Sequence, residues 1–147
     1  MQLKFKRLRS NADLPLPSYH TPHAAGLDLR ADIKESILLK KSERSLVPTG
    51  FAVEIPVGFE GQVRARSGLA IKNGIAVVNA PGTIDADYRG EVCVILINLS
   101  DQDFTIQRGD RIAQLVISPV VQPTIIEVSD LSDTSRGGGG FGSTGGK

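Results

Sequence analysis

The stretch that decides the organisation of this chain is residues 79–92, which read N-A-P-G-T-I-D-A-D-Y-R-G-E-V. The apolar run G-I-A-V-V precedes it at 74–78, and V-C-V-I-L-I follows at 92–97. Pro81 and Gly82 form a strong turn signal, because proline presets φ and glycine tolerates a positive φ. We therefore expect a loop or hairpin held between two strands, a position in which functional groups commonly lie on a rigid scaffold.

Along the rest of the chain, apolar residues recur with a period of two in short runs, which is typical of half-buried strands. The pattern predicts strands at 3–6, 27–32, 51–55, 63–66, 92–99, 112–121 and 124–128. Residues 92–99 are apolar on both faces apart from Asn98, so we expect a central strand buried on both sides. Only 69–72 fits a helical turn. The fold class is therefore predicted to be all-β, a jelly-roll-like sandwich or barrel.

Length and charge narrow the class of protein further. A chain of 147 residues fits one domain, and a net charge of +1 provides no field that would attract nucleic acid or a membrane. No apolar run reaches the roughly 18 residues of a membrane span, and none follows the N-terminus as in a secretory signal. The single cysteine, Cys93, fits a reducing compartment. We expect an intracellular protein, with the cytoplasm as first choice and a nuclear or viral origin left open.

The C-terminal segment has a different composition from the rest. Residues 129–147 begin polar and acidic and end in R-G-G-G-G-F-G-S-T-G-G-K. Such a segment cannot bury enough apolar surface to stay ordered by itself. Glycine amides can converge on an anion, Arg136 offers a planar fork for phosphate, and Phe141 offers an aromatic face. We therefore divide the chain into a β domain, 1–128, and a flexible Gly-rich C-terminal segment, 129–147, for which the resemblance described below implies the role of a lid.

Four stretches besides 82–91 carry groups suited to phosphate or a cation. They are A-G-L-D-L-R-A at 25–31, R-S-G-L-A at 66–70, G-D-R-I-A-Q-L at 109–115 and R-G-G-G-G-F-G-S-T-G at 136–145. Each alone is compatible with an ordinary turn or a flexible spacer. The carboxylates of Asp28, Asp85 and Asp87 suit a hard cation such as Mg²⁺, held through waters and phosphates. His20 and His23 lack the spacing of a zinc site.

Together with G-T-I-D-A-D-Y-R-G-E at 82–91, these stretches occur in one order along nearly the whole chain. In this combination the chain resembles the trimeric dUTP pyrophosphatases, or dUTPases. The resemblance implies Mg²⁺-assisted hydrolysis of dUTP to dUMP and pyrophosphate, which keeps uracil out of DNA and supplies dUMP for thymidylate synthesis. It also implies a homotrimer, in which two subunits build each site and the tail of the third covers it. Seven aromatic residues and no Trp make a thin core, which fits shared buried surface.

The resemblance also implies a role for each motif. Asp85 is expected to activate a water for in-line attack on the α-phosphorus, chemistry that a carboxylate can perform. Asp28 is expected to bond to a water on a Mg²⁺ carried by the triphosphate. Tyr88 is expected to stack on the deoxyribose and exclude a 2′-hydroxyl. The other implied contacts are to uracil from Asn79, Gly82, Thr83, Ile84 and Phe141, and to phosphates from Arg66, Ser67, Gly68, Gln114, Arg136, Gly142, Ser143 and Thr144.

Three other interpretations stay open. A dCTP deaminase of related fold would attack the base and would need a catalytic group at the pyrimidine ring, whereas the carboxylate here lies in G-T-I-D-A-D-Y. A non-hydrolytic deoxyuridine nucleotide-binding module would keep the pocket without turnover, a difference that sequence does not decide. A β-sandwich adhesion or capsid-like protein would leave the Arg-Gly-Phe tail without a role.

Overall fold

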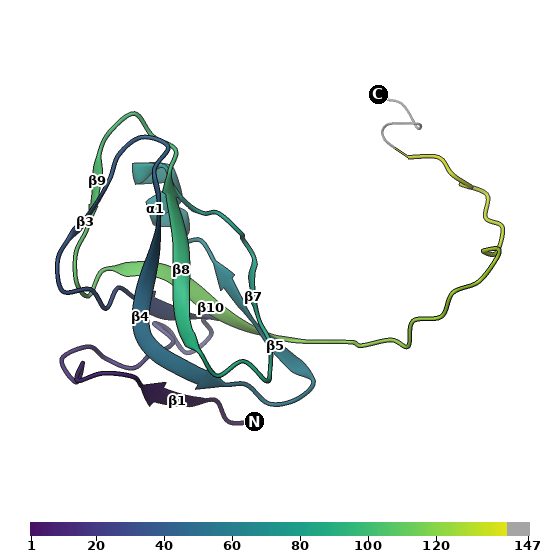
Figure 1. The fold of residues 1–147 in the computed structure, drawn as a ribbon, viewed down its shortest axis with the longest axis horizontal. Helices are drawn as coiled ribbons and strands as arrows, with labels where there is room; N and C mark the ends of the chain where they lie inside the picture. The colour runs from purple at the N-terminus through teal and green to yellow at the C-terminus, as the bar shows by residue number, and fades with distance from the viewer. Residues whose placement is uncertain (141–147) are drawn as a thin grey trace.

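The computed structural model describes residues 1–140, and in this range the chain is built from strands and one helix (Figure 1). In chain order the elements are β1 (Lys4–Arg7), β2 (Gly26–Arg30), β3 (Ile37–Leu39), β4 (Arg44–Glu54), β5 (Phe59–Arg64), α1 (Ser67–Asn73), β6 (Ile75–Val77), β7 (Gly82–Ile84), β8 (Glu91–Asn98), β9 (Phe104–Ile106) and β10 (Arg111–Pro119). No helix among these residues is long and apolar enough to cross a membrane.

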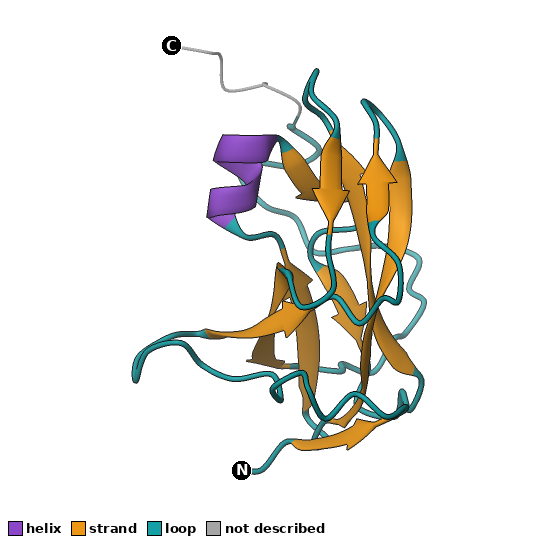
Figure 2. Cartoon of the chain, turned by 90° about the vertical axis from the view of Figure 1, so that its left-hand side faces the viewer, coloured by secondary structure: helices purple, strands orange, loops and turns teal. Residues whose placement is uncertain are grey.

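Two four-stranded antiparallel sheets form a sandwich, one in the order β1-β4-β8-β6 and the other in the order β2-β10-β5-β7. A two-stranded ribbon of β3 and β9 extends from one end, and α1 lies outside the strands (Figure 2). The inward faces share one aliphatic core, in which Leu29, Val47, Val94, Ile106 and Leu115 are at most 1% exposed. The predicted all-β, jelly-roll-like fold is confirmed.

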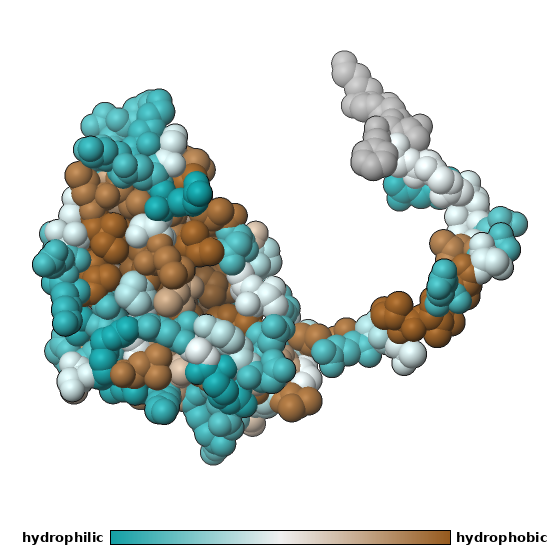
Figure 3. All heavy atoms as spheres, in the orientation of Figure 1, coloured by the Kyte–Doolittle hydropathy of each residue, from teal (hydrophilic) through white to brown (hydrophobic). Residues whose placement is uncertain are grey.

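One face of β8 differs from its prediction. Buried and half-buried residues alternate along the strand, and the outward-facing Cys93, Ile95 and Ile97 are only half-buried. Beside Ile95, Leu46 of β4 is 61% exposed and Val78 is 50% exposed. An apolar area covers this part of the surface (Figure 3). The prediction of a strand buried on both sides is therefore wrong for the single chain.

Two element boundaries also differ from the alternation pattern. The predicted strand at 51–55 is only the second half of β4, because the pairing register with β8 shifts between Pro48 and Ala52. Proline lacks the ladder donor, so its place at a bulge is expected, and it hid the first half of the strand. The helical turn predicted at 69–72 is the longer helix α1, which ends on Gly74 at a left-handed φ of 66°.

After β10 the chain leaves the sandwich as an arm, residues 121–140, which extends away from the body (Figure 1). The apolar side chains of Val121, Ile125 and Leu131 on this arm are almost fully exposed. The strand predicted at 124–128 is wrong, because within residues 1–140 no strand forms there. A strand needs a neighbour to pair with, and the arm has left both sheets.

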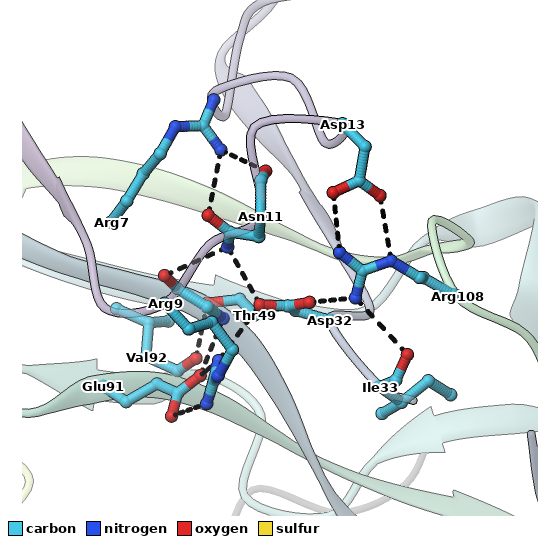
Figure 4. A network of polar contacts seen from close by, with 11 residues as sticks. Arg7, Arg9, Asn11, Asp13, Asp32, Ile33, Thr49, Glu91, Val92 and Arg108 are labelled. Carbon is cyan, nitrogen blue, oxygen red and sulfur yellow. Dashed lines mark hydrogen bonds and ion pairs between the residues drawn. The ribbon is translucent and has the colours of Figure 1, made fainter. Parts of the chain in front are cut away.

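A polar cluster around the buried Asp32 ties the N-terminal segment to the sandwich (Figure 4). We call the residues Arg9, Asn11, Asp32, Glu91 and Arg108 the Asp32 clasp. The Asp32 carboxylate accepts hydrogen bonds from Asn11 Nδ2 at 2.8 Å, from Arg9 Nη1 at 3.1 Å and from Arg108 Nη1. Local sequence patterns do not reveal this cluster, because it joins segments that lie far apart in the chain.

Two further residues complete the surroundings of the clasp. Asp13 receives two hydrogen bonds of 2.9 Å from Arg108, and these bonds hold the pKa of Asp13 below its ordinary value. The carboxylates of Asp13 and Asp32 in turn raise the pKa of the Arg108 guanidinium. Gly50 has a φ of 77°, and a Cβ there would collide with the side chains of Asp32 and Asn11. Glycine at position 50 is thus required twice, by backbone conformation and by space.

Candidate active site

A pocket of about 320 Å³ opens where the 79–92 stretch meets β4 and β8. Its wall brings together Asn79, Thr83, Ile84, Asp85 and Tyr88, all of which the sequence proposed as site residues. The remaining lining residues are Leu46, Glu91, Val92, Cys93 and Ile95. Amide, hydroxyl and carboxylate groups therefore share one cavity with an apolar wall, which is the usual composition of a small-molecule site.

The pairing of three strands places this pocket. β6 and β8 pair antiparallel in one sheet, whereas β7, between them in sequence, pairs with β5 in the other sheet. The stretch thus crosses from one sheet to the other and returns, and the pocket forms at the crossing. The predicted loop between two strands is confirmed, with β7 as an additional short strand inside it.

Close packing at Gly82 brings the Asn79 amide next to the backbone of β7. A Cβ at position 82 would lie 3.0 Å from Asn79 Nδ2 and 3.4 Å from Val63 Cβ. Glycine therefore leaves room for the amide to lie against main-chain donors and acceptors. An amide side chain beside the main chain can present both a donor and an acceptor to the edge of a planar base.

The turn that carries Asp85 and Tyr88 is held by its own backbone. Tyr88 N donates to Asp85 O at 3.1 Å, and Arg89 Nη1 donates to Ala86 O at 2.7 Å. Asp85 lies at a boundary, because it lines the pocket and also a neighbouring open hollow of about 760 Å³. Within the pocket, burial raises the pKa of the Cys93 thiol, so Cys93 is suited to packing rather than to nucleophilic chemistry.

A second group of proposed residues gathers where β2, β5 and β10 meet the start of α1. Asp28 Oδ1 lies 3.4 Å from Arg66 Nε, and Asp28 Oδ2 lies 3.2 Å from Arg111 Nη1. Arg66 Nη1 also donates to the Arg111 carbonyl at 3.1 Å. Gln114 of β10 pairs with Asp28 on one side and with Arg64 on the other. The arrangement concentrates guanidinium donors around one carboxylate, which suits binding of phosphate.

Two buried atoms of this group are unsatisfied. Asp28 Oδ1 and Arg66 Nε have no hydrogen-bond partner among residues 1–140. The two atoms face each other at 3.4 Å in an ion pair that does not meet the geometry of a hydrogen bond, so their hydrogen-bonding capacity is unused among the described residues. No group of three His, Cys, Asp or Glu residues that could hold a metal occurs in the same range. These residues fit a cation held through water by Asp28, and they do not fit a protein cage for the metal.

The other proposed residues are less closely gathered. Ser67 and Gly68 are exposed and open α1 directly after Arg66. Arg136 lies on the arm, where its Nε donates to Gly139 O at 2.8 Å, and the structure does not bring it to either group. Phe141, Gly142, Ser143 and Thr144 lie outside the described residues.

Several lining residues were not proposed from the sequence. Leu46 was missed because the first half of β4 was not recognised as a strand. Arg111 lies next to Asp28 through the pairing of β10 with β2, and only its position three residues before Gln114 offered a clue. Glu91 is the last residue of the G-T-I-D-A-D-Y-R-G-E motif, and this position in the motif could have indicated that Glu91 lies at the pocket.

Together these features define a jelly-roll-like β-sandwich protein with a nucleotide-sized pocket and, at a separate place on the same chain, a cationic cluster. Comparison with known proteins agrees. Residues 12–145 match the model of the dUTPase family. The deoxyuridine 5'-triphosphate nucleotidohydrolase of Caulobacter vibrioides is 60% identical over 147 residues, covering 99% of this chain and 95% of the relative. That of an Anaeromyxobacter species is 63% identical over 132 residues, covering 90% and 88%.

Solved structures show the same relationship. A mutant dUTPase of Staphylococcus bacteriophage 80alpha, determined with dUpNHpp, superposes with a TM-score of 0.83 at 27% identity, covering 98% of each chain. A mutant dUTPase of phage phi11 of S. aureus, described with a structural Mg(II) ion, gives 0.80 at 24% identity, covering 90% of this chain and 100% of that one. The chain belongs to the dUTPase family. It is a hydrolase of nucleotide metabolism, a dUTP diphosphatase.

Proposed function

We propose that this enzyme hydrolyses dUTP through a water that Asp85 activates for in-line attack on the α-phosphorus. The observation that carries the proposal is the gathering of Asn79, Thr83, Ile84, Asp85 and Tyr88 around one pocket in a member of the dUTPase family. In the cell this activity would keep uracil out of DNA and supply dUMP for thymidylate synthesis, in the cytoplasm.

Recognition of the nucleoside is assigned to the pocket wall. The Asn79 amide and the main chain of Gly82 to Ile84 supply donors and acceptors for the uracil edge, and the close packing at Gly82 supports this role. The pocket of about 320 Å³ has Asn79, Thr83 and Ile84 together on its wall, which supports recognition of the base there. Tyr88 would lie against the deoxyribose, with its ring in the place of a 2′-hydroxyl.

The chemical step is assigned to Asp85. Its carboxylate takes a proton from water while the water oxygen forms a bond to the α-phosphorus. The bond from that phosphorus to the bridging oxygen breaks, so dUMP and pyrophosphate are the products. The place of Asp85 at the boundary of the pocket supports this role, because a water there can reach both the carboxylate and a phosphate outside the base site.

Binding of the phosphates is assigned to Arg66, Ser67, Gly68 and Gln114, joined by Arg111. When bound, Mg²⁺ offsets phosphate charge and orders the triphosphate. The unsatisfied Asp28 Oδ1 can accept a hydrogen bond from a water on that ion.

The functional assembly is proposed to be a homotrimer with shared sites, in which a β domain of 1–128 is followed by a covering segment of 129–147. The exposed Leu46 and Val78 beside the half-buried Ile95, and the exposed apolar side chains of the arm, support association between copies. The arm carries Arg136 away from its own sandwich, so Arg136 together with Phe141, Gly142, Ser143 and Thr144 would cover the site of another subunit.

Substrate assays test this function. With Mg²⁺ present, we expect rapid release of pyrophosphate from dUTP, little from dCTP, dTTP or UTP, and no ammonia. Asp85→Asn should lower kcat by about 10²–10⁴-fold with little change in nucleotide binding, because it removes a general base. The matched control is Asp87→Asn in the same turn, which should keep most of the activity. An unchanged kcat in Asp85→Asn, or ammonia released from dCTP, would contradict the proposal.

A further inference from the structure

The phenol of Tyr88 is positioned by Gly90 and Glu91, two and three residues further along the chain. Its hydroxyl donates to the Glu91 carbonyl at 3.0 Å. The ring lies over Gly90, where a Cβ would collide with the phenol oxygen. The place of the ring therefore depends on where the backbone of residues 90–91 is held. Because Tyr88 is 44% exposed, burial alone does not fix it.

The side chain of Glu91 anchors that backbone to the rest of the molecule. Arg9 donates to both carboxylate oxygens, from Nη1 at 2.7 Å and from Nη2 at 2.8 Å (Figure 4). Gly50 N donates to Glu91 Oε1 at 2.7 Å. A two-pronged pair of this kind fixes direction as well as distance, because the guanidinium and the carboxylate are both planar.

Arg9 is itself held at its other side. Its Nη1 reaches the Asp32 carboxylate at 3.1 Å, and the side chain of Asp32 is only 1% exposed. A continuous series of hydrogen bonds thus runs from the buried Asp32 through Arg9 and Glu91 to Tyr88 at the pocket. Arg108 binds the opposite side of Asp32 and is not a member of this series.

We propose that Arg9 and Glu91 are positioning residues that hold Tyr88 against the sugar and so set the preference for deoxyribose over ribose. This rests on the proposed function, in which the Tyr88 ring occupies the place of a 2′-hydroxyl. A ring that can swing aside excludes nothing, so discrimination requires the ring to be tethered as well as present. Neither residue needs to contact the reacting atoms for this effect.

The first test compares substrates. Arg9→Gln should lower the ratio of kcat/KM for dUTP to that for UTP by about three- to tenfold, the worth of one net hydrogen bond in ring placement. The change should lie mostly in a lower KM for UTP, with kcat for dUTP nearly kept. Arg108→Gln is the matched control, because it breaks the other arginine pair of Asp32. Arg108→Gln should reduce stability and leave the ratio of kcat/KM for dUTP to that for UTP at the parent value. The same ratio in Arg9→Gln and Arg108→Gln would overturn the proposal.

A double-mutant cycle tests whether the effect passes through the Tyr88 hydroxyl. Tyr88→Phe removes the bond to the Glu91 carbonyl and should lower the same ratio. In that background Arg9→Gln should add almost nothing, because the tether is already broken. If the two effects multiply, Arg9 acts by another route and the proposal is wrong.

A spectroscopic test is independent of nucleotide chemistry. The chain has two tyrosines and no tryptophan, so Tyr19→Phe leaves Tyr88 as the only strong fluorophore. In that background Arg9→Gln should lower the anisotropy of tyrosine emission, and Arg108→Gln should not. Unchanged anisotropy would refute the positioning role, whatever the substrate. Lower anisotropy with an unchanged dUTP to UTP ratio would refute instead the sugar contact of Tyr88, and with it the specificity claim.

Discussion

Asp28 and Asp32 lie four positions apart in the sequence, both are buried, and each faces two arginines. Their surroundings differ in one respect. The Asp32 carboxylate accepts hydrogen bonds from Arg9, Asn11 and Arg108. Asp28 Oδ1 has no hydrogen-bond partner among residues 1–140, and it forms a 3.4 Å ion pair with Arg66 Nε, which also lacks a hydrogen-bond partner in this range.

The difference indicates two kinds of buried acid. A carboxylate whose acceptor sites are filled from within the protein stabilises the fold, and removing it leaves charges without partners. A carboxylate that lies beside arginines and has one oxygen without a hydrogen bond can accept a hydrogen bond from a ligand or from a water on that ligand. On this view Asp32 belongs to the fold and Asp28 to the function, and the two can be separated by experiment.

Asp32→Ala should have the largest effect. It leaves Arg9, Asn11 and Arg108 without their shared acceptor, so the free energy of unfolding should fall by about 3–5 kcal/mol. Urea unfolding at a fixed protomer concentration measures it, because oligomerisation makes stability depend on concentration. The matched variant Asp28→Ala should lose much less, and equal losses would remove the distinction between the two acids.

Asp28→Asn should change the apparent affinity for Mg²⁺ much more than it changes stability. Stability should change little, because the Arg66 and Arg111 side chains are 24% and 36% exposed and can turn to water. The apparent affinity for Mg²⁺ during dUTP turnover should fall by about 10–100-fold, as for other partners of metal-bound groups. Titrating activity against Mg²⁺ measures this shift. A normal titration curve would show that Asp28 does not act on the metal.

Gly50→Ala tests the Asp32 clasp without changing any of its side chains, because the added Cβ would collide with the clasp. Gly58 supplies a close control: its φ is 86°, and a Cβ there would meet nothing within 4 Å. Gly58→Ala should cost about 1–2 kcal/mol for the left-handed conformation alone. Gly50→Ala should exceed that cost by about 1 kcal/mol or more, through strain and weakened hydrogen bonds in the clasp. Thermal or urea unfolding of the two variants should separate them.

The smallest effect is expected at the exposed rim of the clasp. Hydrogen bonds from Arg108 hold the pKa of Asp13 below its ordinary value. Its contribution to stability is therefore present above the ordinary pKa and is lost as the pH falls through the lowered value. Asp13→Asn should be slightly less stable than the parent near neutral pH and equal to it in strong acid. A difference that grows on acidification would contradict this assignment.

The sequence predicted those parts of the fold and site that depend on local pattern. The apolar pattern identified β1, β2, β8 and β10, overlapped β5 only at its last two residues, and the contiguous stretch 79–92 did supply one pocket. Strand alternation failed at β4, where Pro48 interrupts the pattern. It also failed at 124–128, where a strand-like sequence has no neighbouring strand to pair with among residues 1–140.

The non-local parts could not be predicted in this way. The contact of Asp28 with Arg66 and Arg111 depends on the sheet order β2-β10-β5, which alternation does not specify. The Asp32 clasp joins residues as far apart in the chain as Arg9 and Arg108, and nothing in their local sequences indicates that they meet.

The lack of a side chain at Gly90 has a consequence for engineering. Because the colliding group would be the far end of the Tyr88 ring, any larger residue at position 90 can be accommodated if that ring swings outward. Such a protein would melt normally and pass a screen for solubility or expression. Its defect would emerge only in competition between ribonucleotide and deoxyribonucleotide, so positions 88 and 90 should be varied as one unit in any library that aims to alter sugar preference.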